Sequence, residues 1–401
     1  MKKLAYMSAA VAMSVAQASQ ASVALDPQAV NLEPFRFVPT LTTELKQDSN
    51  VYRLPSNEVS SSVLVVSPTF DLIAQDRDNA YSARYALRAG LYGEDISNYL
   101  DNLFNVNAHI EPTDRFRFDL GAGYNFLHDD LGTAFTEGYT EQQILARGSP
   151  DTYNLATIKG GLEYGAQDAA GQIALDVNFG QTRYDQEDAA KARDIDTLNS
   201  ILEFRLRLMP KTRLLIDLER NKGSYSDSAT ATSSDYTETN YLLGVSWEST
   251  ASTTGKIRFG NSKRELTNVG ADRSKTTWDA GIVWTPLERA RFTLDASQRF
   301  QDGTYPTVVI DSKNLALGWT HDWSDRWQSV LTAGLGKDDH TRVPAAGPRE
   351  DDMHDYGFAL NYQMRRWLIL GAGARQKDRD STDNTYDYDR LVYSLNAQLS
   401  L

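Results

Sequence analysis

The 401-residue sequence contains no cysteine. This absence excludes a disulfide scaffold, a thiolate zinc site, a cysteine nucleophile and a lipid anchor on an N-terminal cysteine. No run of 18 or more apolar residues occurs after the start of the chain, so membrane-spanning helices are excluded too. Positive charge is also scarce, because 41 Lys and Arg stand against 54 Asp and Glu, for a net charge of −13. This balance argues against a nucleic-acid partner, since such binding needs Lys and Arg that face phosphates.

Recognisable catalytic and metal-binding motifs are absent as well. The five histidines form no HExxH, and neither a P-loop nor a G-x-S-x-G occurs. His128 beside Asp129 and Asp130 allows a hydrolase site at a rim, against the alternative of a histidine at a wet strand end. The acidic stretch at 377–389 allows a calcium site, against the alternative of a solvated loop. We therefore predict no catalytic residues, no metal and no cofactor.

The first residues have the features of an export signal. Lys2 and Lys3 precede the apolar stretch LAYMSAAVAMSVA, and the small-residue sites AQA and SQA follow. This pattern predicts a signal peptide over residues 1–21, cleaved after Ala18 or Ala21. Residues 22–34 are then a short periplasmic lead-in, and residues 35–401 form a single domain.

Beyond residue 35 the sequence alternates between apolar and polar residues. In AYSARYALRAGLY (80–92) and DRFRFDLGAGYNF (114–126), every second residue is mostly apolar and those between are mostly polar or small. A period of two is typical of strands with one apolar and one polar face. No segment keeps a helical period beyond about two turns, so we expect no substantial helix.

The connections between these strands alternate in length. Short ones such as EPTD, MPKT and TPLERA separate long ones such as HDDLGTAFTEGYTEQQILARGSPDT. Three of the short ones carry a proline followed by an Arg-x-x-x-Asp strand start, which suits a turn that needs no ladder N–H. Short turns at one end and long loops at the other are typical of bacterial outer-membrane barrels. We predict an all-β, transmembrane antiparallel β-barrel of about 18 strands, with 16 as the alternative.

Aromatic residues support the barrel independently. Six of the seven Trp lie near short turns and many Tyr lie near long loops, as aromatic girdles at two membrane interfaces require. The chain ends in YSLNAQLSL, which resembles the C-terminal signal read by the barrel-assembly machinery, with Leu401 where an aromatic residue is usual.

The polar face of the strands is rich in arginine. By parity, the pore-lining candidates are Arg84, Arg88, Arg115, Arg117, Asp119, Arg205, Arg207, Arg213, Asp217, Arg258, Arg291, Asp295 and Arg299. An Arg and an Asp four residues apart on one strand lie about 13 Å apart and cannot pair with each other. Either they pair across strands as an ion-pair lattice, or the arginines form a basic track along the pore.

The expected size favours transport, because about 16 to 18 strands leave an aqueous channel whereas about 8 do not. The long connection from His128 to Thr152 is the natural constriction, and its ILAR segment (144–147) could anchor it inside.

The early strands carry a family resemblance. LKQDSNVYR (45–53) and VVSPTFDLIAQ (65–75) are similar to the opening of the β-barrel porin family encoded in exopolysaccharide operons, often called EpsL-like. The matching residues are Asp48, Asn50, Val51, Tyr52, Arg53, Ser67, Pro68, Phe70 and Leu72. The resemblance implies an outer-membrane porin in exopolysaccharide secretion, with periplasmic polysaccharide-export proteins as partners.

Together these features predict a passive outer-membrane channel for an exopolysaccharide, surrounded by outer-membrane lipid and lipopolysaccharide. The alternatives are a general or anion-selective diffusion porin, an outer-membrane hydrolase, and a structural or adhesive barrel with a blocked lumen.

Overall fold

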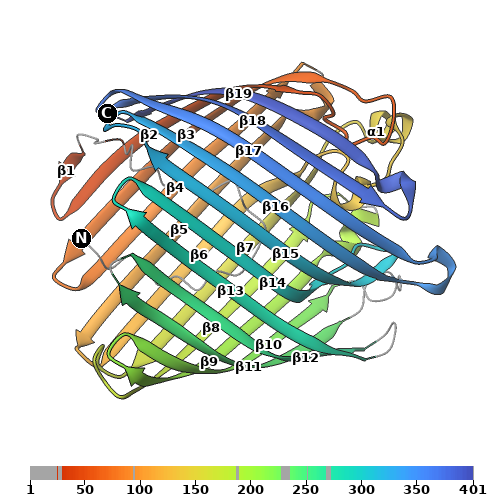
Figure 1. Ribbon diagram of the computed structural model, residues 1–401. Coiled ribbons are helices and arrows are strands. Elements are labelled where there is room, and N and C mark those ends of the chain that lie inside the picture. The colour runs from red at the N-terminus through yellow and green to blue at the C-terminus, as the bar shows by residue number, and fades with distance from the viewer. Residues whose placement is uncertain are drawn as a thin grey trace.

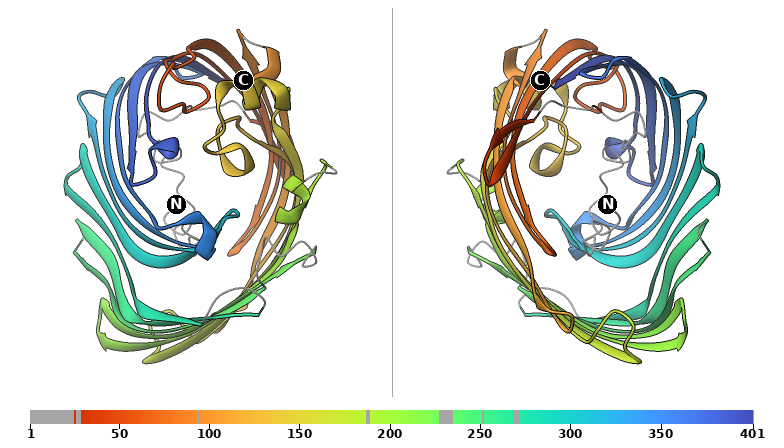
Figure 2. Two further views of the ribbon diagram at one scale, coloured as in Figure 1. Left: turned by 90° about the vertical axis from the view of Figure 1, so that its right-hand side faces the viewer. Right: turned by 90° about the vertical axis from the view of Figure 1, so that its left-hand side faces the viewer.

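Antiparallel strands close into a single barrel (Figures 1 and 2). The computed structural model describes residues 25, 29–93, 95–186, 189–226, 235–250, 252–267 and 272–400. Each of the 18 barrel strands, β2 to β19, pairs with its neighbours in the sequence, and β19 pairs with β2 so that Leu395 lies opposite Leu45. The predicted all-β architecture and strand number are confirmed.

The strands run for 13 to 17 residues, long enough to cross a bilayer at a tilt. Their bounds are β2 Phe35–Asp48, β3 Ser61–Asp76, β4 Asn79–Tyr92, β5 Tyr99–Thr113, β6 Phe116–Asp129, β7 Asp151–Tyr164, β8 Gly171–Tyr184, β9 Ile195–Met209, β10 Thr212–Tyr225, β11 Tyr236–Thr250, β12 Thr253–Leu266, β13 Arg273–Leu287, β14 Ala290–Asp302, β15 Thr307–Asp322, β16 Trp327–Arg342, β17 Arg349–Arg365, β18 Leu368–Ser381 and β19 Tyr388–Ser400. A short strand, β1 (Val30–Leu32), pairs with the start of β2 and lies within the predicted lead-in.

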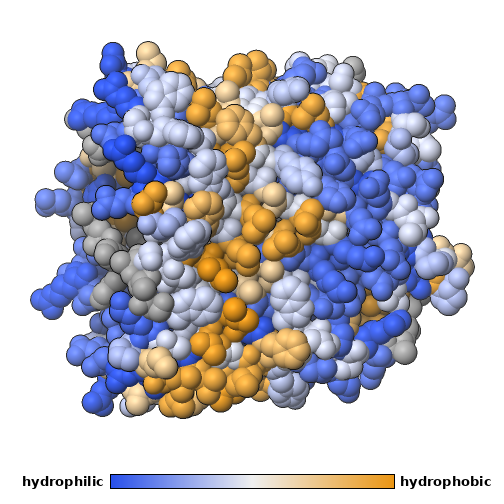
Figure 3. All heavy atoms as spheres, in the orientation of Figure 1, coloured by the Kyte–Doolittle hydropathy of each residue, from blue (hydrophilic) through white to orange (hydrophobic). Residues whose placement is uncertain are grey.

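The two faces of the sheet differ as the alternation predicts. Large apolar side chains such as Phe116 and Phe204 are about two-fifths exposed, while their sequence neighbours Arg117 and Glu203 turn to the other face. An apolar band crosses the middle of the outer surface between polar ends (Figure 3). This band is the surface that a β-barrel presents to hydrocarbon.

Short turns and long connections lie at opposite ends. In Figure 1, β1 and the end of β19 share the short-turn end, and the helix α1 lies at the long-loop end. Pro112 and Pro286 fall in the last residues of β5 and β13, and Pro210 falls in the turn between β9 and β10. At these positions a missing N–H costs the sheet little.

Two expectations need correction. The long connection between β6 and β7 contains a 7-residue helix, α1 (Glu141–Arg147), where the sequence showed no substantial helix. Thr140 and Gln143 cap its start reciprocally, and Gly148 ends it with a left-handed φ of 77°. Arg115 was assigned to a strand, but the pairing of Thr113 with Phe116 places it in the β5–β6 turn.

No helix in the described ranges is long and apolar enough to cross a membrane. The predicted signal peptide (1–21) and Leu401 lie outside the described residues.

Candidate functional site: the pore and its mouth

The β2–β3 connection is a rigid support at the long-loop end. Asn50, which is fully buried, donates through Nδ2 to the carbonyl oxygens of Leu54 and Asp389, both at 2.9 Å. Its Oδ1 accepts from the backbone N–H of Leu54 at 2.9 Å. Asp48 accepts from Arg390 Nε of β19 at 3.0 Å. Two of the residues that carry the family resemblance, Asp48 and Asn50, therefore fold this connection and tie it to β19, the strand that closes the barrel.

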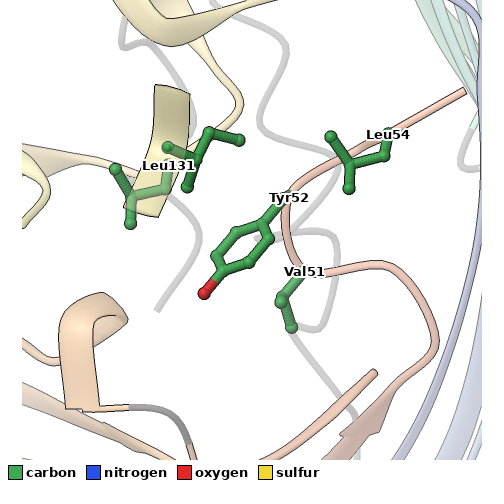
Figure 4. Close-up of a cluster of buried hydrophobic side chains, with 5 residues drawn as sticks. Val51, Tyr52, Leu54 and Leu131 are labelled. Carbon is green, nitrogen blue, oxygen red and sulfur yellow. The ribbon is translucent and has the colours of Figure 1, made fainter. Parts of the chain in front are cut away.

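The β6–β7 connection packs onto this support. We call residues 130–150 the mouth loop. Val51, Tyr52 and Leu54 of the support form a buried apolar cluster with Leu131 and Ile144 of the mouth loop (Figure 4). Ile144 belongs to α1 and has no exposed surface. Burial of such a side chain contributes about 1.5–3 kcal/mol, so the cluster holds the loop in place without covalent links.

A charged contact reinforces the cluster. Arg53 donates to the Asp130 carboxylate at 3.0 Å and to the carbonyl oxygen of Leu131 at 3.2 Å. Partial burial alone would raise the pKa of Asp130, but His128 and Arg53 outweigh it and hold that pKa well below its ordinary value. The carboxylate is thus ionised at neutral pH and paired.

The far side of the mouth loop reaches another part of the wall. Glu137 accepts from Arg349 of β17 at 3.3 Å and also from Arg379 of β18. The Arg349 guanidinium lies 3.4 Å from the centre of the Tyr386 ring, in the connection between β18 and β19. Since the mouth loop joins β6 to β7 and reaches β17 and β18 through Glu137, it crosses part of the barrel opening (Figure 2). This geometry fits the predicted role of the His128–Thr152 connection as a constriction.

Several predicted pore-lining residues meet in one cluster on the inner wall. We call Asp217, Glu219, Arg258, Asp279 and Arg299 the wall cluster. Arg258 donates to Asp217 at 2.7 Å and to Glu219 at 2.8 Å, and it lies 3.0 Å from Asp279. Arg299 donates to Glu219 and Asp279, each at 2.7 Å. The residues come from β10, β12, β13 and β14, so they pair across strands as the lattice alternative requires.

Other predicted residues are also engaged with neighbours. Arg84 donates to Asp71 of β3 at 2.6 Å, and His109 lies 2.7 Å from Asp119. Arg205 lies 3.1 Å from Glu163, which also accepts from Arg117. Arg213 donates to the carbonyl oxygen of Gln167 beyond the end of β7. Arg84, Arg117 and Arg205 are therefore balanced by carboxylates, and Arg213 is hydrogen-bonded to the backbone.

A smaller group on the same face keeps its charge unbalanced. Within the described residues, the side chains of Arg88, Arg207 and Arg291 make no ion pair or hydrogen bond. All three are exposed. Arg88 is near the long-loop end of β4, whereas Arg207 and Arg291 are near the short-turn ends of β9 and β14. Asp295 is likewise without a partner in the described part of the chain.

Residue patterns alone did not single out the arginines that hold the mouth loop and its support. Arg349, Arg379 and Arg390 were not among the candidates, although Arg375, Lys377 and Arg379 alternate along β18 in the sequence GARQKDRD. Because every second residue of a strand points to the same face, this alternation predicts that the three basic residues face the lumen together. Their partners lie far away in the sequence, so nothing local identified the contact with Glu137.

The structure argues against His128 as the general base that the hydrolase alternative needs. His128 Nδ1 lies 2.7 Å from Asp101 and Nε2 lies 3.2 Å from Asp130. Both ring nitrogens are therefore committed to carboxylates, and neither is free to activate a nucleophile. Within the described ranges, no three His, Asp or Glu residues come together as a metal site.

The comparisons with known proteins agree with the fold. The family model described as Putative beta-barrel porin 2 matches residues 25–401. No curated protein matches the chain. Family and fold are consistent with a place in the outer membrane.

Solved structures of similar fold are bacterial barrels of low sequence identity. The FrpB iron transporter from Neisseria meningitidis is 12% identical with a TM-score of 0.50, covering 86% of this chain and 61% of that one. The ferric enterobactin receptor from Pseudomonas aeruginosa is 9% identical with a TM-score of 0.49, covering 91% and 80%. OccAB3 from Acinetobacter baumannii is 11% identical with a TM-score of 0.48, covering 92% and 100%. At such identities the likeness concerns the fold alone.

Proposed function

We propose that this protein is a passive outer-membrane channel through which an exopolysaccharide leaves the cell. The premise of the proposal is that the chain belongs to the family described as Putative beta-barrel porin 2. The long-loop end faces outward and the short-turn end faces the periplasm, where polysaccharide-export proteins would deliver the polymer. The channel carries out no chemistry, in keeping with the committed ring nitrogens of His128.

One observation carries this proposal. Residues of the exopolysaccharide-porin resemblance, including Asp48, Asn50 and Arg53, build the support on which the mouth loop rests. This part of the resemblance therefore falls on the support that holds the mouth loop across part of the barrel opening. A wide barrel with a mouth narrowed by noncovalent contacts suits a thin, flexible chain, since the wall provides an aqueous path and the loop limits its width.

The test is deletion of the gene, with complementation by the wild type. We expect loss of surface polysaccharide, accumulation of polymer in the periplasm, and unchanged uptake of small solutes. Normal surface polysaccharide in the deletion strain would rule out the export role.

A diffusion porin is the second candidate, and the unbalanced Arg88, Arg207 and Arg291 favour it. Fixed charges in an aqueous pore select ions without any polymer. In that case the deletion strain would keep its surface polymer and lose uptake of small anions, which is the opposite result.

A further inference from the structure

A polar cavity of about 400 Å³ lies directly beneath the mouth loop. Asp130 and Thr133 of that loop line one side, and strands β2 to β7 and β19 supply the rest. We call it the tyrosine pocket, because Tyr92, Tyr99 and Tyr153 line it. Its volume is within the range of small-molecule sites, about 300–1,000 Å³.

The three tyrosines offer both apolar and polar contacts. Tyr99 stacks on His128 with ring centres 3.8 Å apart, and the Tyr92 ring lies 6.3 Å from Tyr99 at a steep angle. In the described part of the chain, none of the three hydroxyls has a hydrogen-bond partner, whereas the nearby Tyr184 hydroxyl donates to Asp129 at 3.0 Å. A half-buried tyrosine hydroxyl ordinarily finds a partner, so these three groups are available to a ligand. A sugar ring matches them, since it has apolar C–H faces and a rim of hydroxyls.

The charges around the tyrosine pocket are balanced except at one point. Arg390 is paired with Asp48, His128 with Asp101, and Lys46 lies 3.1 Å from Glu44. Arg88 is the exception among the described residues that line the cavity. Its guanidinium carbon lies 5.5 Å from the centre of the Tyr99 ring and no carboxylate neutralises it. A guanidinium presents paired N–H donors that match a carboxylate.

We propose that the tyrosine pocket binds one uronic-acid-type sugar of an acidic polysaccharide. The rings of Tyr92 and Tyr153 contact the C–H face of the sugar, the free hydroxyls bind its hydroxyl groups, and Arg88 receives its carboxylate, while Tyr99, stacked on His128, offers only its hydroxyl. This assignment deepens the proposed export function and rests on it for the polymeric nature of the ligand. The pocket lies under the constriction, so a sugar bound there would be the last one held before the polymer passes the mouth loop.

The experiment uses the purified full chain in detergent and two probes of equal length. Trigalacturonate carries the carboxylates, and its fully methyl-esterified form is neutral. Isothermal titration should show binding of the acid and at least about tenfold weaker binding of the ester, since hydrogen bonds to charged groups are the stronger ones. Arg88→Gln should weaken binding of the acid by a similar factor and leave binding of the ester unchanged. Lys263→Gln is the charge-matched control, because Lys263 is on the outer face, paired with Glu265.

A second variant keeps the sugar site testable even if Arg88→Gln does not fold. Tyr153→Phe removes only one hydroxyl and should weaken binding of both probes by a comparable factor. Equal affinity for acid and ester, or equal losses in Arg88→Gln and Lys263→Gln, would overturn the role of Arg88. No binding of either probe would overturn the sugar site. The binding assay and the deletion assay read different quantities, so failure of this assignment is distinguishable from failure of the export function.

Discussion

At the scale of single residues, one glycine decides how closely the mouth loop approaches its support. Gly132 has a φ of 77°, and a Cβ added there would lie 1.9 Å from the backbone oxygen of Tyr52. Backbone atoms cannot yield as a flexible side chain can. Gly148, at the end of α1, has the same φ of 77° but nothing within 4 Å of such a Cβ. The two glycines share a backbone conformation and differ only in the close approach.

This difference gives a matched pair of variants. Gly132→Ala should separate the mouth loop from the support and raise the single-channel conductance in planar bilayers. Gly148→Ala should cost about 1–2 kcal/mol of local backbone strain and leave the conductance unchanged. Equal conductance in the two variants would show that the contact at Tyr52 does not set the width of the mouth.

Glu137 makes the closure of the mouth dependent on pH. Its partial burial alone would raise its pKa, but Arg379 and Arg349 outweigh this and lower the pKa below the ordinary 4.5. The contact therefore contributes its full stability above pH 4.5 and loses it as the pH falls through the lowered pKa. We expect the channel conductance to rise on acidification in that range and to stay constant between pH 6 and 8.

Other charged groups face the same arginines, so a variant must isolate Glu137. Asp351 also pairs with Arg349, and the Tyr386 ring covers that guanidinium. Glu137→Gln removes the charge at Glu137 alone. Its conductance at pH 7 should match that of the acidified wild type. If Glu137→Gln conducts as the wild type does at neutral pH, the acid effect arises elsewhere.

At the scale of one strand, the alternation of side chains can be tested in β14. Leu294 lies on the apolar outer face, opposite Ile282 and Leu317, whereas the next residue along the strand, Thr293, faces inward. Leu294→Arg should destabilise the barrel by about 2–4 kcal/mol, because an arginine near the bilayer midplane is costly. Thr293→Arg should be mild. Urea unfolding in lipid vesicles measures both, and equal losses would contradict the assigned faces.

Strands and turns were predictable because their signals are local. The period of two gave the faces of strands such as β4 and β6, and the alternation of loop lengths gave the two ends of the barrel. The helix α1 was missed since two turns are too short for a periodicity argument. Its capping residues Thr140 and Gln143 and its terminal Gly148 were the available signal.

At the scale of the whole molecule, the pore wall depends on register. Parity identified Arg84, Arg88, Arg205 and Arg207 as inward-facing, yet only cross-strand pairing separates the balanced from the unbalanced ones. Arg84 lies opposite Asp71, whereas Arg88 lies opposite Asp101, which is taken by His128. No single strand contains this information. The mouth was harder still to predict, because Glu137 and its arginines are more than 200 residues apart in sequence.

The final prediction concerns ion selectivity. A paired arginine and its carboxylate cancel at a distance, so the sign of the field in the lumen follows from the inward groups that have no ion pair in the described part of the chain. They include the cations Arg88, Arg207, Arg291, Lys159 and Lys256, offset in part by Asp176 and Asp295. We expect the wild-type channel to prefer anions weakly, most clearly at low salt, because a Debye length of about 8 Å at physiological ionic strength screens exposed charges. The triple variant Arg88→Gln, Arg207→Gln, Arg291→Gln should shift the reversal potential toward cation preference.

The control removes a balanced pair instead. Arg84→Gln with Asp71→Asn deletes one cation and one anion from the wall and should leave the reversal potential unchanged. If the pair deletion shifts selectivity as much as the triple variant does, the paired arginines also act on ions in the pore. Cation preference in the wild type would mean that carboxylates such as Asp295 outweigh the unbalanced arginines. An acidic polymer would then meet repulsion along the wall, and a neutral one would be the better substrate for this channel.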